Sequence, residues 1–247
     1  MVYGIILAGG KGSRVTGAEL PKQFVKLGGK PLIMHSTLTM LRAKVVDAVI
    51  VVVPDEYMDH AKDVMDEYLD DVCKSNKKME IIAGGYDRET SLLRAIDHVS
   101  KGDSFKDDIF VTHDACRPFM DEDMITKTVE GAAACGAATV ALPCLDTMAT
   151  GGGGYLTGAM DRSALYNVET PQTFKPYEYL GLLKKDENDR ACGSAGGNET
   201  YTDVTGRYIK AGKKVAIVSG DRMNFKITYD EDFALAEACL AMVECNS

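Results

Sequence analysis

Residues 2–14 are Val2-Tyr3-Gly4-Ile5-Ile6-Leu7-Ala8-Gly9-Gly10-Lys11-Gly12-Ser13-Arg14, an apolar run that passes directly into a glycine-rich turn. The apolar part has the length and β-branched character of a buried strand. Glycines let backbone N–H groups approach a ligand without Cβ atoms in the way, and such groups form a nest for phosphate oxygens. Arg14 and the later Lys22 would add positive charge there. The stretch therefore predicts a strand followed by a phosphate-binding turn.

Short apolar runs alternate with amphipathic stretches along the rest of the chain. We expect strands at residues 2–7, 48–53, 80–83, 109–113, 139–143, 215–218 and 225–228, and helices at 32–41, 57–69, 90–99, 121–135, 202–211 and 230–243. This alternation is typical of βαβ units around a mainly parallel sheet. The expected fold is therefore α/β, a Rossmann-like three-layer α/β/α domain that takes in residues 1–247.

Two stretches interrupt the alternation, residues 146–165 and residues 186–200. In the first, strand-like pieces at 147–150 and 155–160 flank four consecutive glycines, as in a hairpin. A two-stranded hairpin is only marginally stable alone in water. We therefore expect a protruding β-arm that packs on a second subunit and forms a homodimer. The second stretch is polar, and we expect a mobile surface loop there.

The overall charge limits the classes of partner. The 247 residues carry 28 basic and 37 acidic side chains, so the formal net charge is −9. Such a balance gives no general attraction to nucleic acid or to an anionic membrane, and an anionic ligand needs a local cluster of cations. No apolar run reaches the roughly 18 residues of a membrane span, and residues 2–7 lead straight into glycines without the pattern of a signal peptide. We expect a cytoplasmic protein.

Other readings of the glycine-rich turn can be compared with the sequence. A Walker A loop needs G-x-x-x-x-G-K-[ST], which does not occur. A dinucleotide fingerprint needs G-x-G-x-x-G/A, but the run that starts at Gly10 ends in Val15. A merely flexible turn needs neither three glycines in four positions nor two basic residues beside them. A nicotinamide-dependent oxidoreductase and a non-catalytic nucleotide-binding protein are the alternatives that stay open.

Six further motifs follow in order: Pro21-Lys22-Gln23, Gly84-Gly85-Tyr86-Asp87-Arg88 with Ser91, His113-Asp114-Ala115-Cys116-Arg117-Pro118, Asp146-Thr147, Thr170-Pro171-Gln172 and Asn224-Phe225-Lys226-Ile227-Thr228. With the glycine-rich turn they resemble, over nearly the whole chain, the cytidylyltransferases that join CTP to a polyol phosphate. Two groups share the pattern, the methylerythritol 4-phosphate enzymes of isoprenoid synthesis and the ribitol 5-phosphate enzymes of teichoic acid and capsule synthesis. The resemblance implies a nucleotidyltransferase fold, CTP and a polyol phosphate as substrates, Mg²⁺ as cofactor and pyrophosphate as a product.

The resemblance also implies a set of nucleotide-binding residues: Ala8, Gly9, Gly10, Lys11, Gly12, Ser13, Arg14, Lys22, Gly84, Asp87, Arg88, Ser91, Asp114 and Ala115. The cations expected to act on the reacting phosphates are Arg14, Lys22 and Lys226. Asp114 ends an expected strand, where open α/β sheets place their ligand crevice, and we assign it to Mg²⁺ because a hard cation on phosphates takes one or two carboxylates. His113 points to the opposite face by strand alternation, so we expect it to pack or form hydrogen bonds. Other roles stay open: Asp87 or Thr90 as a helix cap, and Asp114 as the ion-pair partner of Arg117.

By the same resemblance, four residues bind the acceptor phosphate, one of them from the neighbouring subunit: Arg117, Thr147, Arg162 and Lys226. The alternative role of the last three is a surface hydrogen bond or ion pair. The chain departs from the isoprenoid-pathway pattern at Met223, which stands where a common Asp is a candidate second metal ligand; Asp221 is the nearest carboxylate. Ribitol-type relatives also tend to lack that Asp. We therefore expect D-ribitol 5-phosphate as acceptor, with 2-C-methyl-D-erythritol 4-phosphate as the alternative.

Overall fold

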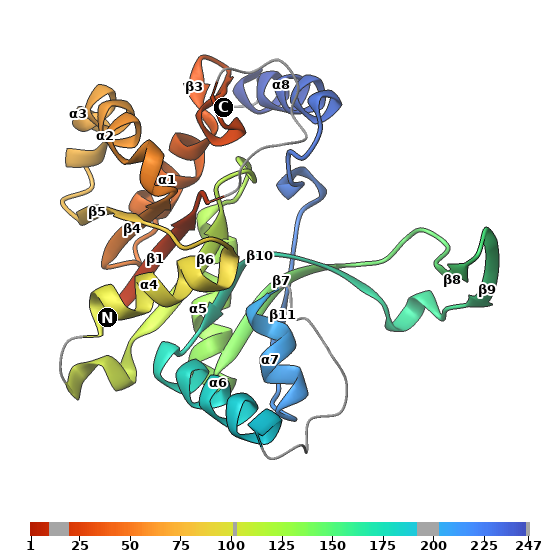
Figure 1. The fold of residues 1–247 in the computed structure, drawn as a ribbon. Coiled ribbons are helices and arrows are strands. Elements are labelled where there is room, and N and C mark those ends of the chain that lie inside the picture. The colour runs from red at the N-terminus through yellow and green to blue at the C-terminus, as the bar shows by residue number, and fades with distance from the viewer. Residues whose placement is uncertain (10–19, 101–102, 192–202, 246–247) are drawn as a thin grey trace.

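A seven-stranded sheet forms the centre of the computed structural model, which describes residues 1–9, 20–100, 103–191 and 203–245 (Figure 1). The order is β11-β7-β10-β6-β1-β4-β5. Its strands are β1 (Val2–Leu7), β4 (Ala48–Val53), β5 (Lys78–Ala83), β6 (Ile109–Asp114), β7 (Ala137–Pro143), β10 (Tyr166–Phe174) and β11 (Ala216–Ser219). All neighbouring pairs are parallel except those of β10, which runs antiparallel between β6 and β7. The mainly parallel α/β sheet predicted from the sequence is confirmed.

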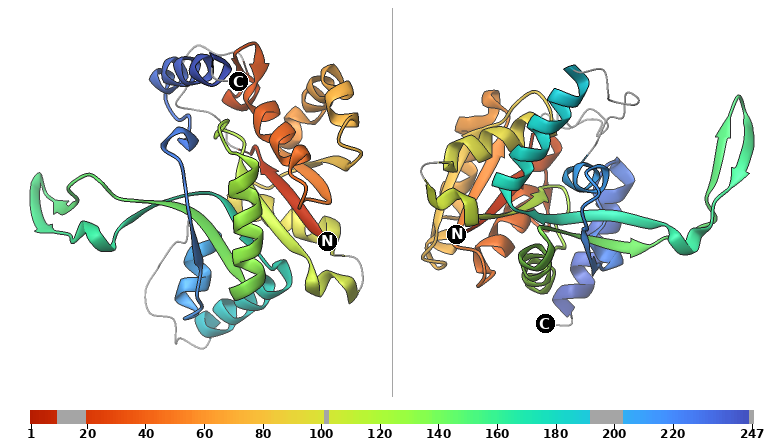
Figure 2. Two further views of the ribbon diagram at one scale, coloured as in Figure 1. Left: turned by 180° about the vertical axis from the view of Figure 1, so that it is seen from behind. Right: turned by 90° about the horizontal axis from the view of Figure 1, so that it is seen from below.

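Helices cover both faces of this sheet, as Figure 2 shows. The helices are α1 (Leu32–Arg42), α2 (Met58–Glu67), α3 (Leu69–Cys73), α4 (Arg88–Val99), α5 (Glu122–Cys135), α6 (Pro176–Ala191), α7 (Val204–Lys210) and α8 (Asp230–Cys245). Successive side chains of a strand point to opposite faces. Ile6 and Val51 therefore pack in a core with α1, α2 and α5, whereas Ile5 and Val52 pack in a second core with α4, α6 and α7. One core lies on each face of the sheet, between the sheet and a layer of helices, so the three expected layers are present.

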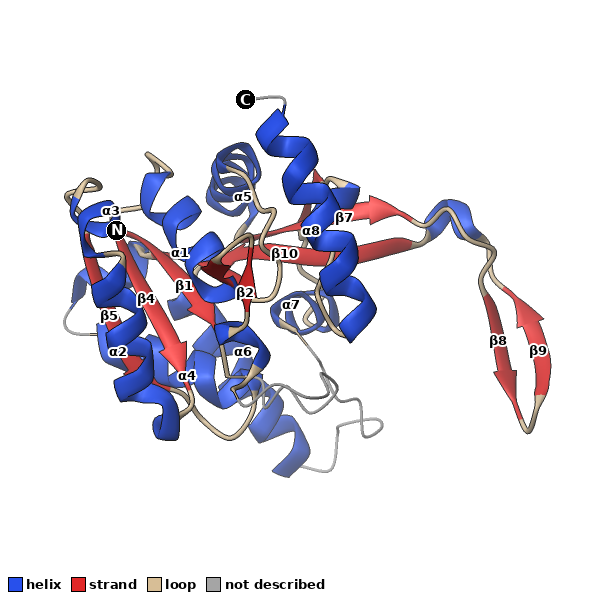
Figure 3. Ribbon diagram, turned by 90° about the horizontal axis from the view of Figure 1, so that it is seen from above, coloured by secondary structure: helices blue, strands red, loops and turns tan. Residues whose placement is uncertain are grey.

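A small hairpin and the last helix lie beside the main sheet (Figure 3). The hairpin consists of β2 (Lys26–Leu27) and β3 (Lys30–Pro31) and follows the 3-10 turn η1 (Lys22–Phe24). Leu27 packs with Ile227 and with Ala236 of α8 in a separate apolar cluster. This cluster joins the chain around Lys22 to the chain around Lys226, which are far apart in sequence.

A β-arm projects from the body of the molecule, as the sequence predicts (Figures 1 and 2). Its strands are β8 (Ala149–Gly152) and β9 (Tyr155–Ala159), and all their residues are exposed. The 3-10 turn η4 (Arg162–Ala164) leads from the arm back to β10. The structure contains one chain, so the expected packing of the arm on a second subunit stays a prediction.

Three expectations about elements were wrong or incomplete. Residues 225–228 do not form a strand but an extended segment after the 3-10 turn η5 (Arg222–Asn224), held by a hydrogen bond from Ile227 N to Cys116 O. Strand β10 was not expected. Helix α6 was not expected either, and it takes in the first part of the predicted loop at 186–200, whose remaining residues lie outside the described ones. No helix within the described ranges is long and apolar enough to cross a membrane.

Candidate active site

The ends of β1 and β6 place two predicted motifs side by side. Leu7 and Asp114 are partners in the parallel register of these strands, so the residues that follow each strand leave the sheet at the same edge. Ala115 N donates to Leu7 O at 3.0 Å, and Gln23 Nε2 donates to Ala8 O at 2.7 Å. Ala8 and Gly9 thus lie beside Asp114 and Ala115, as predicted. The predicted residues Gly10, Lys11, Gly12, Ser13 and Arg14 lie outside the described part of the chain.

Ser91 joins the turn after β1 to the loop after β5. Its hydroxyl accepts from Gly85 N at 3.0 Å and donates to Asp87 O at 2.7 Å. A Cβ on Gly84 would lie 2.9 Å from Ser91 Oγ, and one on Gly9 would lie 3.3 Å from it. The two glycine loops therefore approach the same buried hydroxyl, and a side chain at Gly84 would push it away.

The N-terminus of α4 explains the residues between these glycines and Ser91. Asp87 Oδ1 accepts from Thr90 N at 2.8 Å, and Asp87 N donates to Thr90 Oγ1 at 3.1 Å. This reciprocal pair is a capping box, so the helix-cap role that the sequence left open for Asp87 and Thr90 is confirmed. The box fixes the first turn of α4, from which Arg88 extends toward Asp114.

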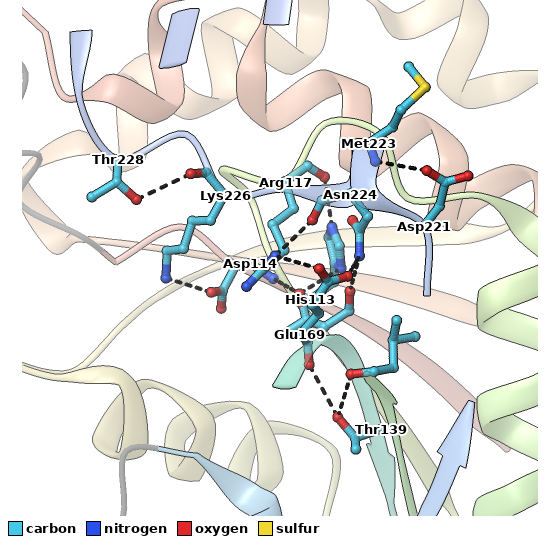
Figure 4. Close-up of polar contacts among 12 residues, drawn as sticks. His113, Asp114, Arg117, Thr139, Glu169, Asp221, Met223, Asn224, Lys226 and Thr228 are labelled. Carbon is cyan, nitrogen blue, oxygen red and sulfur yellow. Dashed lines mark hydrogen bonds and ion pairs between the residues drawn. The ribbon is translucent and has the colours of Figure 1, made fainter. Parts of the chain in front are cut away.

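Asp114 lies near three cations, Arg88, Arg117 and Lys226, the last two of which are labelled in Figure 4. Its Oδ2 accepts from Lys226 Nζ at 2.7 Å, and its Oδ1 lies 3.4 Å from Arg88 Nε. Burial by itself would raise the pKa of the Asp114 carboxyl, but Arg88, Lys226 and Arg117 outweigh it and hold that pKa well below its usual range. Among the described residues, the ion-pair partners of the Asp114 carboxylate are thus Arg88 and Lys226, and the ion pair with Arg117 that the sequence left open does not form.

Lys22 is buried beside the segment that carries Lys226. Lys22 Nζ donates to Ile227 O at 2.8 Å, although the two residues are 205 positions apart. The backbone of Ile227 also donates to Cys116 O, which ties the same segment to the loop after β6. The structure therefore brings Lys22, Asp114 and Lys226 together, which the sequence predicted only through the resemblance.

Arg117 lies next to two buried polar residues, Glu169 and Asn224. Its Nη1 donates to Asn224 O at 2.7 Å and lies 3.9 Å from Glu169 Oε1. Burial lowers the pKa of Arg117, although the carboxylates of Asp114 and Glu169 act in the opposite direction. Arg117 is thus a buried cation that faces Glu169 and the segment before Lys226.

His113 links β6 to β10 and stays uncharged. Its Nε2 lies 2.9 Å from Arg117 O, and its Nδ1 lies 2.9 Å from Thr170 Oγ1. Because a carbonyl only accepts, Nε2 carries the proton and Nδ1 accepts from the hydroxyl. Burial lowers the pKa of His113 to about 4. The hydrogen-bonding role predicted for His113 is confirmed.

The comparisons with known proteins agree with this geometry. The family model for IspD, 2-C-methyl-D-erythritol 4-phosphate cytidylyltransferase, matches residues 2–242. The chain is 31% identical over 239 residues to a Lactiplantibacillus plantarum protein named ribitol-5-phosphate cytidylyltransferase, covering 96% of this chain and 97% of that one. The chain belongs to the IspD family.

Solved structures of IspD-type enzymes share the fold. A 4-diphosphocytidyl-2C-methyl-D-erythritol synthase from Anaerococcus prevotii matches with a TM-score of 0.78 at 24% identity, over 97% of this chain and 96% of that one. A 2-C-methyl-D-erythritol 4-phosphate cytidylyltransferase from Thermus thermophilus matches with a TM-score of 0.69 at 25% identity, over 96% and 98%. The IspD-family chain is therefore a nucleotidyltransferase that joins CTP to a polyol phosphate, and the oxidoreductase and non-catalytic readings fall away.

Thr147 and Arg162, the remaining predicted acceptor residues, belong to the arm of this IspD-family chain. Both are exposed, and the described partner of Arg162 is Leu145 O, 3.2 Å from Arg162 Nη1. Within the described ranges, no contact joins either residue to Lys22, Asp114 or Lys226 of the same chain. The structure therefore does not bring them to the site within one subunit, and a role there requires a second subunit.

The sequence motifs include Thr170 and Asn224 but not Glu169, and they assign none of the three residues a role. Asn224 Nδ2 donates to Glu169 Oε2 at 2.9 Å and to Thr170 O at 2.8 Å. Thr170-Pro171-Gln172 and Asn224-Phe225 were recognised as motifs, and that was the available signal. Asp221 Oδ1 accepts from Met223 N at 2.8 Å and so caps η5.

Proposed function

We propose that this IspD-family enzyme transfers CMP from CTP to D-ribitol 5-phosphate and releases pyrophosphate. The observation that carries the acceptor is the 31% identity, over nearly the full length of both chains, to a protein named ribitol-5-phosphate cytidylyltransferase. Met223, at the position where the isoprenoid-pathway pattern has an Asp, supports the same acceptor. The alternative acceptor is 2-C-methyl-D-erythritol 4-phosphate, which the name of the matching family model favours.

The chemistry needs cations in place and no general base. A phosphate oxygen of the acceptor attacks the α-phosphorus of CTP, a new P–O bond forms, and the bond to the β-phosphate breaks as pyrophosphate leaves. The attacking oxygen is already an anion, so no proton has to be removed. Catalysis then rests on holding the phosphates in line and on balancing the negative charge that accumulates there.

The described cations are arranged for that task. We assign Lys22, with Arg14, to the phosphates of CTP, and Lys226 to the α-phosphate and the incoming phosphate. Lys226 Nζ is exposed enough to exchange Asp114 for a phosphate, since its side chain is 44% accessible. We assign the acceptor phosphate to Arg117 and Lys226 of one subunit, together with Thr147 and Arg162 from the arm of a second subunit. A homodimer is thus part of the proposal.

Asp114 fits a role as the Mg²⁺ ligand. It lies at the carboxyl edge of the sheet. It is ionised, because Arg88, Lys226 and Arg117 hold its pKa well below the usual range. Within the described residues no group of three His, Cys, Asp or Glu side chains could hold a metal by itself, so phosphate oxygens and water would complete the shell. Bound there, Mg²⁺ would neutralise phosphate charge. Asp221 is a candidate for a second carboxylate.

Product analysis tests the acceptor. The enzyme is incubated with CTP, Mg²⁺ and D-ribitol 5-phosphate, and phosphorus NMR follows the products. The proposal predicts a new diphosphate diester together with an equal amount of pyrophosphate. Formation of the diester only when 2-C-methyl-D-erythritol 4-phosphate replaces ribitol 5-phosphate would overturn it.

A further inference from the structure

A buried carboxylate lies directly behind the residues assigned to the acceptor. Glu169 belongs to β10, at the irregular part of the strand that precedes Gln172, and is only 8% exposed. Its Oε2 accepts from Asn224 Nδ2 at 2.9 Å, and its Oε1 lies 3.9 Å from Arg117 Nη1. The proposed reaction gives Glu169 no task, yet its carboxylate forms an ion pair with Arg117 (Figure 4).

Asn224 connects Glu169 to the segment that carries Lys226. Its fully buried amide donates to Glu169 Oε2 and to Thr170 O, so β10 fixes it at two points. Its own backbone carbonyl accepts from Arg117 Nη1 at 2.7 Å. Lys226 follows two residues later. Glu169 is therefore linked to both cations assigned to the acceptor phosphate, to Arg117 directly and to Lys226 through the segment Asn224-Phe225.

This arrangement is costly to build, which argues against a mere packing role. Burial raises the pKa of Glu169, while Arg117 and the Asn224 hydrogen bond act to lower it. An apolar side chain of similar volume would often stabilise such a site more than a buried ion pair does. The segment of the same chain at Gly220 also leaves room for the carboxylate. A Cβ on Gly220 would lie 3.1 Å from Glu169 Oε2 and 2.8 Å from Val140 Cγ1.

The cluster also has unused hydrogen-bonding capacity. Arg117 Nε and Asn224 Oδ1 are buried, and neither has a hydrogen-bond partner among the described residues. Buried polar atoms normally have partners, and the exceptions concentrate where strain or function retains them. Glu169 and its neighbours therefore hold the side chains of Arg117 and Asn224, while one polar atom of each side chain is left without a hydrogen bond among the described residues.

We propose that Glu169 is a positioning residue for the acceptor phosphate. Its carboxylate orients the guanidinium of Arg117 and, through Asn224, fixes the segment that carries Lys226. The proposal rests on the proposed function, in that Arg117 and Lys226 bind the acceptor phosphate. It predicts that changes at Glu169 weaken binding of the acceptor and leave binding of CTP nearly unchanged.

Two variants separate the charge of Glu169 from its hydrogen bond. In Glu169→Gln the side-chain carbonyl still accepts from Asn224, but the negative charge that Glu169 places beside Arg117 is lost. In Glu169→Ala both are lost. Glu80→Gln is the matched control, because Glu80 is a half-buried, ion-paired glutamate of β5 at the far edge of the same sheet.

Steady-state kinetics with CTP and ribitol 5-phosphate give the first readout. The KM for ribitol 5-phosphate should rise about 3- to 10-fold in Glu169→Gln and more in Glu169→Ala, with the KM for CTP within about twofold of the wild type. Glu80→Gln should match the wild type. An acceptor KM that stays within twofold in Glu169→Ala would overturn the proposal. So would parallel increases in both KM values with a lowered Tm, because they indicate general damage.

The second readout does not depend on turnover. The Nε–H signal of Arg117 is followed by NMR and identified by its loss in Arg117→Lys. A buried, oriented guanidinium predicts a slowly exchanging signal in the wild type, with exchange at least about tenfold faster in Glu169→Ala. An unchanged signal would overturn the positioning role. If the wild type turns over neither polyol phosphate, the proposed function fails while this signal still decides the role of Glu169.

Discussion

Asp114 shows at the scale of a single residue how the charges of the site are balanced. Its carboxylate binds Lys226 and Arg88, two cations that would otherwise repel each other in a crowded pocket. Under the proposed function, a phosphate that arrives at Lys226 would replace one anionic partner by another, so the exchange would avoid leaving a partly buried ammonium group unpaired. The same exchange would release an oxygen of Asp114. The proposed function thus couples Lys226 and Asp114 from the start of substrate binding.

Lys22 gives the first prediction at this scale. We expect Lys22→Ala to lower kcat by about 10²- to 10³-fold, because the variant removes a buried cation aimed at developing phosphate charge. Lys22 also holds Ile227 O, so some loss of acceptor affinity should accompany the change. Pyrophosphate release measures the first effect, and circular dichroism checks that the variant is folded. Near-normal turnover would show that Lys22 has no catalytic role.

His113 gives a prediction about pH and stability. Unfolded histidine takes up a proton near pH 6.5, whereas burial lowers the pKa of His113 in the folded protein to about 4. The unfolded state therefore binds more protons between these values, and the free energy of unfolding falls as the pH is lowered from about 6.5 to 4. The contribution of His113 is on the order of 3 kcal/mol. Urea unfolding without Mg²⁺ should show a smaller acid loss in His113→Gln than in the wild type; an equal loss would contradict this.

The β-arm poses the question of assembly at the scale of an element. Leu156 is 82% exposed and Tyr155 80%, on a two-stranded hairpin with no helix beneath it. Large exposed apolar groups of this kind mark protein contacts. We expect the wild type to sediment as a dimer at micromolar concentration and Leu156→Asp to shift it toward monomer. Acceptor turnover should fall as well, because the proposed function places Thr147 and Arg162 of one subunit in the site of the other.

Ile209→Asp is the control for the arm, because Ile209 is 65% exposed on α7 of the body. It receives the same change of side chain without touching the arm. It should leave the sedimentation coefficient and the turnover unchanged. A wild type that is monomeric and fully active would contradict the proposed roles of the arm in dimer formation and in the site.

The elements also show which parts of the fold could be predicted. The apolar runs of β1 and β4 are buried and β-branched, and both strands have the bounds predicted from the sequence. Strand β10 escaped prediction because Glu169, Thr170, Pro171 and Gln172 interrupt it with polar residues and a proline, which are typical of loops. Glu169 and Thr170 form buried hydrogen bonds with Asn224 and His113 instead of packing in an apolar core. Residues 225–228 have strand-like composition, but they are held by Lys22 and Cys116 instead of a neighbouring strand.

The site as a whole was partly predictable for a similar reason. Lys22, Asp114 and Lys226 stand in recognisable motifs, and the fold brings them together, as the resemblance implies. Glu169 and Asn224 carry no signal in their spacing, since they are 55 residues apart and meet only because η5 lies against β10. Their polarity in a buried place becomes informative once the fold is known. Sequence motifs therefore do not reveal such a cluster, whereas the hydrogen bonds between its buried polar side chains do.

At the scale of the whole molecule, the acceptor is the central claim. The most direct test is Mg²⁺-dependent pyrophosphate release from CTP, measured in parallel with D-ribitol 5-phosphate and with 2-C-methyl-D-erythritol 4-phosphate. The account predicts a kcat/KM for ribitol 5-phosphate at least about 100-fold above that for the other acceptor, since binding sites that read hydroxyl groups discriminate strongly. The reverse preference would contradict the ribitol assignment and make Met223 a tolerated substitution in an isoprenoid-pathway enzyme.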